Sequence, residues 1–217
     1  SVNDLLRRLK DSIGTQKRFL ADAAHQLKTP LAGLRMQADL AQRKDAGEDE
    51  LKQSLKQIGR ASVQATHTVN QLLSLARAEG GGAIDFQTCD MEALISEVLN
   101  DSLPHAMDKG IDLGYDGVDS EKKRKFLKLQ GNPTLLKEMI RNLVDNAIHY
   151  TPSTPERMGI ITVRLLVDPY SKALAVQVED NGPGIAAAER ERVFEPFYRA
   201  LGSNVDGSGL GLPIVRE

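Results

Sequence analysis

Two asparagines on a predicted helix have the type and spacing needed to hold a divalent cation beside phosphate groups. Asn142 and Asn146 are four residues apart, so both side chains project from one helix face. Amide oxygens are hard ligands that can bind Mg²⁺ while phosphate oxygens fill its other positions. His149 and Tyr150 follow at the helix end, where they would lie beside a planar base or its phosphates. On their own, two helical asparagines more often cap or solvate a helix.

Two glycine-rich segments are suited to bringing the backbone close to a nucleotide. Asp180 ends a predicted strand and precedes Gly182 and Gly184, whose lack of a side chain permits close approach. Its carboxylate can accept a hydrogen bond from an exocyclic amine, although the same string is also typical of an ordinary turn. The second segment leads into a predicted helix, so its backbone N–H groups and the helix N-terminus favour phosphates. This segment consists of Gly207, Ser208, Gly209, Leu210 and Gly211.

Residues 194–206, between the two glycine segments, are predicted to form a mobile lid anchored by aromatic side chains, with Arg199 available for a phosphate. The second glycine segment is neither of two common nucleotide motifs. No strand at the start of a βαβ unit immediately precedes it, as a Rossmann fingerprint requires, and the Gly-Lys-Ser/Thr of a Walker loop is absent from the sequence.

A histidine near the start of the chain is the candidate nucleophile. Leu20, Ala23 and Leu27 share one face of the predicted first helix, and His25 lies nearly opposite when residues are placed about 100° apart. An exposed imidazole can act as a nucleophile that another domain reaches. Thr29 shares its face one helical turn later. Base rates favour an ordinary surface histidine, but the string His-Gln-Leu-Lys-Thr-Pro within an apolar helix shifts the balance.

The first part of the chain predicts two long helices joined by a polar loop at residues 44–49. Apolar residues recur in steps of three and four along residues 6–41 and 51–76, which is a heptad pattern. Pro30 frees the carbonyl of Gln26 and is expected to bend the first helix beside the histidine. A lone hairpin cannot enclose such a seam, so we expect two copies to pair into a four-helix bundle. The alternative is a hairpin packed on its own second domain.

Three consecutive glycines, residues 80–82, predict a boundary between two domains, residues 1–82 and residues 83–217. Past this boundary, helices alternate with mostly antiparallel strands, which predicts an α+β sandwich of two layers. Asp90 and Asn132 are expected to cap helices that run toward Gly110 and to Tyr150, with Pro104 bending or ending the first early. The strands are expected at 84–89, 111–115, 126–130, 159–167 and 173–180.

Composition excludes several classes of protein. The 217 residues carry a net charge of −2, so general binding to nucleic acid is not expected, and the basic run at 122–125 is interpreted as a solvated loop. A single cysteine, Cys89, excludes an intramolecular disulfide or a multi-cysteine metal site. The sequence contains no run of eighteen apolar residues, so no membrane span is predicted within it.

Five motifs in order resemble those of the sensor histidine kinases of two-component systems. His25-Gln-Leu-Lys-Thr-Pro is similar to the H box, and residues 142–150 to the N box. Residues 180–184 resemble the first glycine box, residues 194–197 the F box, and residues 207–211 the second glycine box.

The resemblance implies a dimerisation and histidine-phosphotransfer hairpin followed by the ATP-binding (Bergerat-type) fold shared with gyrase, Hsp90 and MutL. It implies autophosphorylation of His25 from ATP and transfer to an aspartate in the receiver domain of a response regulator. Asp180 would bind the adenine amine, Asn146 and Asn142 would hold Mg²⁺, and Tyr150 would flank the base. Related ATPases carry a water-activating glutamate where this chain has Asn142, which favours transfer to a protein nucleophile over hydrolysis.

The sequence departs from the family pattern at Gln26 and His149. Gln26 follows the histidine where most members have an acidic residue, and an amide cannot become a base, so slower autophosphorylation is expected. Thr29 matches the position that in the family helps to orient water for dephosphorylation of the regulator, so the resemblance also implies phosphatase activity. His149 stands where a lysine is common, which predicts weaker or pH-dependent nucleotide binding. The alternative function is therefore a degenerate kinase that serves as a dimeric scaffold or phosphatase.

The resemblance also implies further helix and strands after Glu217, since a sheet ending there would have an unpaired edge. The chain is therefore expected to be a C-terminally incomplete fragment. By the same resemblance it is the cytoplasmic portion of a bacterial inner-membrane sensor, attached to the membrane only through preceding segments.

Overall fold

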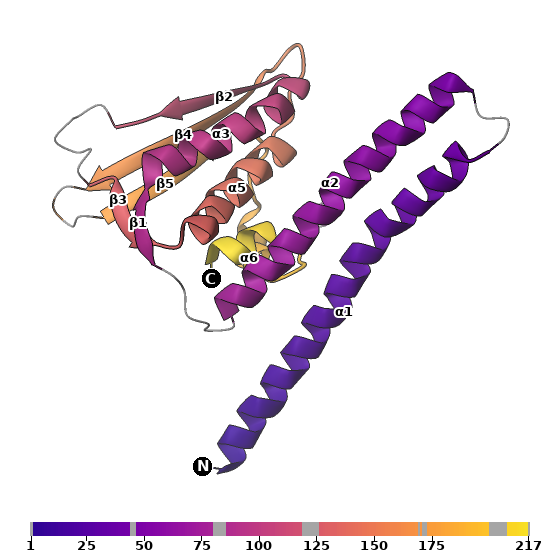
Figure 1. Ribbon diagram of the computed structural model, residues 1–217. Coiled ribbons are helices and arrows are strands. Elements are labelled where there is room, and N and C mark those ends of the chain that lie inside the picture. Colours follow the sequence, from indigo (N-terminus) through magenta and orange to yellow (C-terminus); the bar gives the residue numbers. More distant parts are fainter. Residues whose placement is uncertain are drawn as a thin grey trace. The chain divides into compact units, whose positions relative to one another are not determined.

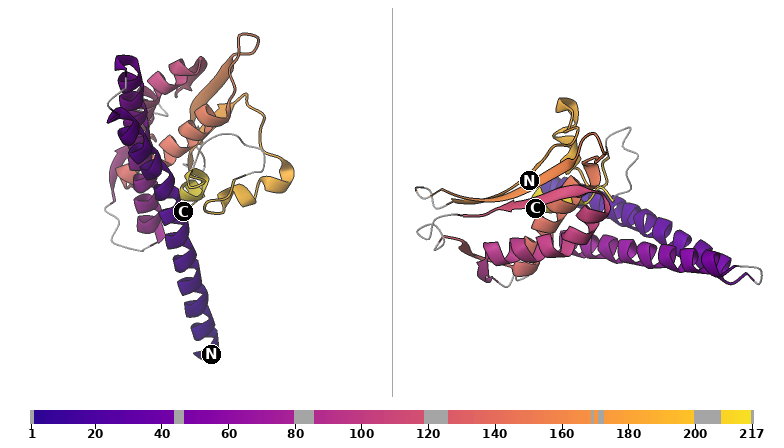
Figure 2. Two further views of the ribbon diagram at one scale, coloured as in Figure 1. Left: turned by 90° about the vertical axis from the view of Figure 1, so that its right-hand side faces the viewer. Right: turned by 90° about the horizontal axis from the view of Figure 1, so that it is seen from above.

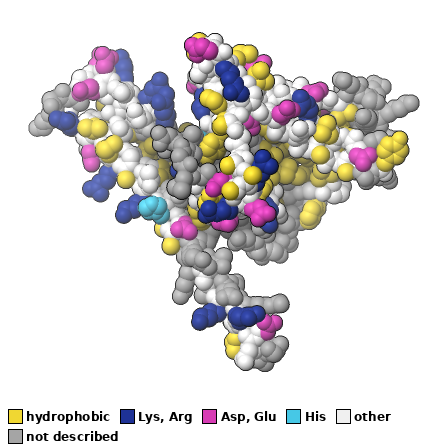
Figure 3. All heavy atoms as spheres, turned by 180° about the vertical axis from the view of Figure 1, so that it is seen from behind, with side chains coloured by type: hydrophobic (Ala, Val, Ile, Leu, Met, Phe, Trp, Pro, Cys, Tyr) yellow, Lys and Arg dark blue, Asp and Glu magenta, His cyan; other side chains and the backbone are white. Residues whose placement is uncertain are grey.

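The computed structural model describes residues 2–43, 47–79, 86–118, 126–168, 170, 173–199 and 208–216. The chain divides into two compact units, residues 1–73 and 74–217. Among the described residues, no helix is both long enough and apolar enough to span a membrane. Acidic and basic side chains are interspersed over the face seen in Figure 3.

The first unit consists of the predicted helical hairpin (Figure 1) without the last six residues of its second helix, which belong to the second unit. Helix α1 covers Val2–Ala41 and helix α2 covers Glu48–Glu79. Pro30 lies inside α1, which continues for a further eleven residues. Three residues of the predicted loop, 44–46, and the predicted boundary at residues 80–82 lie outside the described part of the chain. The boundary therefore stays a prediction.

Several residues of the predicted heptad seam are exposed in the single chain. Leu31 and Leu55 are each 56% exposed, and Leu51 and Val69 are each 39% exposed. Burial of a large aliphatic side chain contributes about 1.5–3 kcal/mol of stabilising free energy, which is missing while the side chain stays in water. The hairpin by itself thus leaves part of its apolar seam uncovered.

Gly59 supplies a stability prediction for α2. A Cβ at this helical position would meet nothing within 4 Å, and glycine costs about 0.5–1 kcal/mol relative to alanine inside a helix. Gly59→Ala is therefore expected to raise the free energy of unfolding by about that amount, measured as a higher urea midpoint with an unchanged slope. Gly110→Ala is the contrasting control and should lower the midpoint, because Gly110 has φ of +66°. A lower midpoint for Gly59→Ala would contradict the prediction.

The second unit contains two short helices of 3-10 type, three α-helices and five strands among its described residues after α2. In chain order they are β1 (Gln87–Asp90), α3 (Met91–Asp108), β2 (Ile111–Asp116), β3 (Lys128–Gly131), α5 (Pro133–Tyr150), β4 (Gly159–Asp168), β5 (Ala173–Asp180), η1 (Ala187–Glu189), η2 (Arg192–Phe194) and α6 (Gly211–Arg216). The predicted first and third strands are shifted along the chain, to 87–90 and 128–131. Residues 84 and 85 lie outside the described residues.

The main sheet has the strand order β2–β4–β5 (Figures 1 and 2). Strand β4 runs parallel to β2 and antiparallel to β5, whereas β1 and β3 form a separate antiparallel pair. Parallel strands need a long crossover, and the chain between β2 and β4 provides one that includes β3 and α5.

Both predicted helix caps are confirmed. Asp90 Oδ1 accepts hydrogen bonds from the N–H groups of Glu92 and Ala93, and Asn132 caps α5 in the same way. The sequence predicts that Pro104 bends this helix or ends it early. The early end is wrong, because α3 continues to Asp108. Proline removes one hydrogen bond, to the carbonyl of residue 100, and Asn100 and Pro104 are both exposed. Water can therefore hydrate the freed carbonyl.

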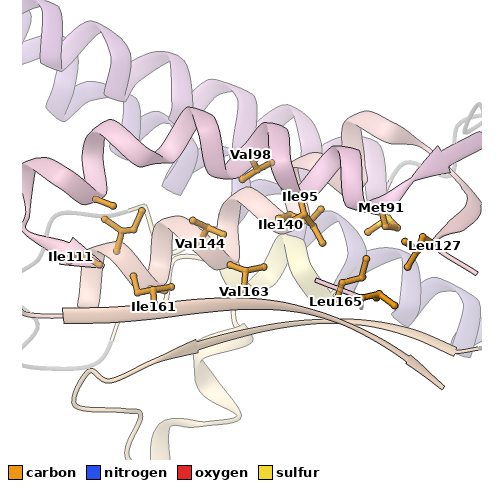
Figure 4. Close-up of a cluster of buried hydrophobic side chains, with 14 residues drawn as sticks. Met91, Ile95, Val98, Ile111, Leu127, Ile140, Val144, Ile161, Val163 and Leu165 are labelled. Atoms are coloured by element: carbon orange, nitrogen blue, oxygen red, sulfur yellow. The ribbon is translucent and has the colours of Figure 1, made fainter. Parts of the chain in front are cut away.

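The core lies between the sheet and one layer of helices. Helices α3 and α5 cover the same face of the sheet (Figures 1 and 2). Ile161 and Val163 of β4 are fully buried and point toward Ile140 and Val144 of α5 (Figure 4). The alternate side chains of β4 lie on the other face, where Ile160 is 44% exposed. This alternation produces the predicted two-layer α+β sandwich.

Candidate functional site

His25 lies on the solvent side of α1, as the sequence predicts. Its side chain is exposed, whereas Ala23 and Leu27 are half-buried. An imidazole in this position is accessible to a reactant approaching from solvent. The helix holds its backbone rigidly, because residues on both sides belong to the continuous α1.

Gln26 and Thr29 accompany the histidine on α1. Gln26 is half-buried and Thr29 is exposed. Thr29 follows His25 by four residues, so the two side chains lie on one face of the helix. The roles predicted for Gln26 and Thr29 in the reaction stay predictions.

Helix α5 carries four of the predicted nucleotide-binding residues. Asn142 is 2% exposed, Asn146 and His149 are half-buried, and Tyr150 is more exposed near the helix end. The rings of His149 and Tyr150 meet edge to face, with centroids 5.9 Å apart and planes inclined by 62°. Side-chain exposure thus increases from Asn142 in the middle of the helix to Tyr150 at its end.

The second glycine segment lies directly against the two asparagines. A Cβ placed on Gly211 would lie 3.3 Å from Nδ2 of Asn146 and 3.4 Å from Oδ1 of Asn142. Only a residue without a side chain approaches these amides so closely without displacing them. The fold therefore brings together three residues that are separated in sequence by up to 69 positions.

The first glycine segment lies against the C-terminal end of α5. Asp180 pairs with the buried Ile161 in the β4–β5 ladder, so its side chain emerges on the helix-covered face of the sheet. Its Oδ1 accepts a hydrogen bond of 2.9 Å from the N–H of Gly182. A Cβ on Gly182 would lie 3.2 Å from the carbonyl oxygen of Tyr150. Asp180, Gly182 and Tyr150 thus form one cluster.

The F box and the second glycine segment meet through their backbones. The N–H of Phe197 donates to the carbonyl of Gly209 at 2.9 Å. A Cβ on Gly209 would lie 2.8 Å from the backbone carbon of Phe197, and Gly209 has φ of +69°. Phe197 itself has φ of +65°, which is uncommon for an aromatic residue. The contact holds the start of the predicted lid against the glycine segment.

The remaining predicted residues are only partly placed. Ser208 is half-buried, its Oγ accepts from the N–H of Leu210 at 3.2 Å, and Leu210 is fully buried. Gly184 is exposed with φ of +72°, and Arg199 is exposed at the end of the described stretch. Gly207 and residues 200–206 of the predicted lid lie outside the described residues.

Lys109 also belongs to this region, although no sequence motif marks it. Its Nζ donates to the carbonyl oxygens of Ile148 and His149 at 3.0 and 3.3 Å, which are among the unpaired carbonyls at the end of α5. Partial burial lowers the pKa of Lys109. No local signal predicts this contact, because the lysine lies about forty residues before its partners.

These residues fit a magnesium-bound nucleotide. Two amide side chains face a glycine cradle that a single Cβ would fill, and amide oxygens suit Mg²⁺. The carboxylate of Asp180 and the ring of Tyr150 lie at the C-terminal end of α5. There the carboxylate can bind an exocyclic amine and the ring can pack on a base.

Comparison with known families identifies both parts of the chain. Residues 15–81 match the family described as His Kinase A (phospho-acceptor) domain. Residues 131–217 match the family described as histidine kinase-, DNA gyrase B-, and HSP90-like ATPase. The chain belongs to the two-component sensor histidine kinases. The histidine kinase core predicted from the five motifs is thus confirmed at the level of the family.

Curated relatives of this histidine kinase core are sensor proteins. Sensor protein kinase PmrB of Pseudomonas aeruginosa is 34% identical over 100% of this chain and 43% of its own length. Sensor protein QseC of Escherichia coli K12 is 34% identical over 100% of this chain and 45% of its own length. The chain thus spans less than half the length of these relatives.

A solved structure has the same fold as the kinase core. Histidine kinase ThkA in complex with response regulator protein TrrA matches with a TM-score of 0.63 at 22% identity, over 91% of this chain and 55% of that chain. Together with the helical hairpin and the α+β unit described above, this similarity confirms the predicted fold class.

Proposed function

We propose that this kinase core phosphorylates His25 from ATP and passes the phosphoryl group to an aspartate of a response regulator. One observation carries the proposal: the two glycine segments converge on opposite ends of the asparagine-bearing stretch of α5. Gly211 lies at Asn142 and Asn146, and Gly182 lies at Tyr150. A nucleotide bound along this stretch would have its phosphates at the amides and its base near Asp180.

In the proposed reaction, an imidazole nitrogen of His25 attacks the γ-phosphorus of ATP. A nitrogen–phosphorus bond forms, the bond to the bridging oxygen breaks, and ADP leaves with the electron pair. The imidazole proton goes to solvent, because the amide of Gln26 cannot accept it. In the second step a carboxylate oxygen of the receiver aspartate attacks the phosphorus and the nitrogen–phosphorus bond breaks. The departing imidazole keeps the electron pair and takes a proton from solvent, which restores its neutral form.

The residues of the second unit act by positioning and by neutralising charge. Asn146 and Asn142 would hold Mg²⁺, which would offset the negative charge on the phosphates. Asp180 would accept a hydrogen bond from the adenine amine, and His149 and Tyr150 would flank the nucleotide. Backbone N–H groups of the second glycine segment would bind phosphate oxygens at the start of α6.

The proposed partners are a second copy of the chain and a receiver domain. The exposed seam residues, Leu51, Leu55 and Val69 among them, support pairing of two hairpins. The solved relative ThkA forms a complex with the response regulator TrrA, which supports a receiver domain as the second reactant. A cytoplasmic position beneath a membrane sensor is proposed because the curated relatives are sensor proteins.

The proposal is tested with γ-labelled ATP and Mg²⁺. We expect the protein to acquire a label that is lost in acid, as a nitrogen–phosphorus bond would be, and to pass it to a receiver domain added afterwards. An intact dimer that binds no fluorescent ATP analogue would instead support the degenerate scaffold. Steady release of phosphate from a His25→Ala protein would support a stand-alone ATPase.

Gly182→Ala is expected to lower the affinity for ATP by about tenfold or more, since each tenfold loss needs only about 1.4 kcal/mol. The new Cβ would lie 2.7 Å from Oδ1 of Asp180 and 3.2 Å from the carbonyl oxygen of Tyr150, so Asp180 must move. Displacement of a fluorescent nucleotide measures the effect. Gly114→Ala is the matched control, because a Cβ there lies 3.9 Å from the nearest atom. Equal ATP affinity in both variants would contradict the prediction.

A further inference from the structure

We propose that Asn181 and Arg157 form a clamp that positions Asp180 and thereby sets the preference for adenine over guanine. The inference rests on the proposed nucleotide site and adds to it two positioning residues that the sequence reasoning did not assign. Neither of them needs to touch the nucleotide.

Asn181 makes three hydrogen bonds to the chain at the start of β4, two to Ile160 and one to Met158 just before the strand. Its backbone N–H donates to the carbonyl of Ile160 at 3.1 Å. Its side-chain Oδ1 accepts from the N–H of Ile160 at 2.9 Å, and its Nδ2 donates to the carbonyl of Met158 at 3.0 Å. The side chain therefore uses its acceptor on the neighbouring strand and its donor on the residue before that strand.

This arrangement replaces one bond of the β-ladder. The β4–β5 register pairs Ile161 with Asp180, so Asn181 is opposite Ile160. In an ordinary antiparallel pair of this kind, Ile160 would donate to the backbone carbonyl of Asn181. Here the side-chain oxygen takes that place. The backbone carbonyl is thereby released from the sheet, and the chain can turn away at Gly182 without leaving the N–H of Ile160 unpaired.

Arg157 is the hydrogen-bond partner of the released carbonyl. Its guanidinium donates to the carbonyl oxygen of Asn181. The loop that carries Arg157 is itself closed, since Thr154 and Arg157 exchange backbone hydrogen bonds of 3.0 and 3.2 Å. The arginine therefore holds the carbonyl of the peptide between Asn181 and Gly182. The asparagine side chain fixes the residue that carries this carbonyl to Met158 and Ile160.

The orientation of this peptide decides where the carboxylate of Asp180 lies. The N–H of Gly182 belongs to the held peptide and donates to Oδ1 of Asp180 at 2.9 Å. A carboxylate accepts hydrogen bonds but cannot donate them. Adenine presents an amine donor at the position where guanine presents a carbonyl, so a fixed carboxylate attracts the first and repels the second. A carboxylate that can move away discriminates less.

The test compares four variants with the wild-type chain. Asn181→Ala removes both side-chain bonds, and Asn181→Asp keeps the acceptor but places an oxygen against the carbonyl of Met158. Arg157→Ala removes the outer bond, and Arg157→Lys keeps one donor. Arg164→Ala is the matched control. It breaks ion pairs with Asp116 and Glu179 across the same strands but leaves the turn untouched.

Two measurements are made on each protein. Amide hydrogen exchange at Ile160 and Gly182, measured without nucleotide, reports whether the hydrogen bonds of the clamp are intact. Dissociation constants for ATP and GTP, from displacement of a fluorescent analogue, report the selectivity. We expect Asn181→Ala to speed exchange at both amides and to reduce the ratio of the GTP to the ATP dissociation constant by about tenfold, as expected for one lost hydrogen bond of about 1.4 kcal/mol.

The variants should rank in a definite order. Asn181→Asp and Arg157→Ala should show smaller losses of selectivity than Asn181→Ala, and Arg157→Lys should recover part of the loss. Arg164→Ala should lower the thermal midpoint and leave the ratio unchanged. An unchanged ratio in Asn181→Ala, or an equal fall in Arg164→Ala, would overturn the inference. Wild-type protein that binds no ATP would refute the nucleotide site itself, and unchanged exchange at Gly182 in Asn181→Ala would refute the clamp independently.

Discussion

His25→Ala is expected to reduce acid-labile labelling from γ-labelled ATP to background. The imidazole is exposed on α1 and is the proposed nucleophile, and alanine offers no atom that could form the nitrogen–phosphorus bond. The substitution should leave the fold intact, because an exposed helical position accepts alanine readily. Circular dichroism and ATP affinity should therefore match those of the wild-type protein while the label disappears.

His105→Ala is the matched control for this loss. His105 is an exposed histidine in the last turn of α3, and its removal should leave the labelling unchanged. A label that persists in His25→Ala would disprove the assignment of the nucleophile. A label lost in both variants would show that the effect is not specific to His25.

Asn146→Ala is expected to reduce labelling by at least about 100-fold, the scale seen when one electrostatic contact to a transition state is removed. Asn146 is half-buried, and its amide lies with that of Asn142 against Gly211. Loss of one proposed Mg²⁺ ligand would leave the phosphate charge poorly neutralised. Labelling as a function of Mg²⁺ concentration measures the effect, and a higher requirement for Mg²⁺ is expected.

Asn100→Ala is the corresponding control, since Asn100 is an exposed asparagine on α3. Its labelling rate and magnesium dependence should match those of the wild type. Wild-type magnesium dependence in Asn146→Ala would contradict the proposed metal role.

The two defective proteins can also be combined. Mixed dimers of His25→Ala and Asn146→Ala subunits contain one intact histidine and one intact nucleotide site. Recovered label on the Asn146→Ala subunit would indicate transfer between subunits, whereas no recovery in verified mixed dimers would indicate transfer within one subunit.

Local patterns predicted most of the second unit. Asn132 followed by Pro133 marks the start of α5, and the structure begins the helix at Pro133 and ends it at Tyr150. A side-chain cap and a proline at the first helical position act within a few residues, so the sequence contains the whole signal. The strand predicted at residues 159–167 likewise matches β4, which covers Gly159–Asp168.

Pro104 shows where a local rule was insufficient. Proline predicted a bend in α3 or its early end, and the helix in fact continues for four more residues. Neighbouring turns pack Val98 and Ala106 into the core, and this burial outweighs the loss of one hydrogen bond at an exposed position. The balance depends on tertiary contacts that no window of the sequence contains.

The sequence by itself determined the types of chemical group in this protein, their order along the chain and the faces of the helices that carry them. Those properties follow from residue identity and from spacings of three or four. Only the tertiary structure decided that Gly211 lies against Asn142 and Asn146 and that Gly182 lies against Tyr150. It also decided that the side chain of Asn181 takes the place of a backbone carbonyl in the sheet. Each of these contacts joins segments more than twenty residues apart, so packing and strand register place them, and local preference does not.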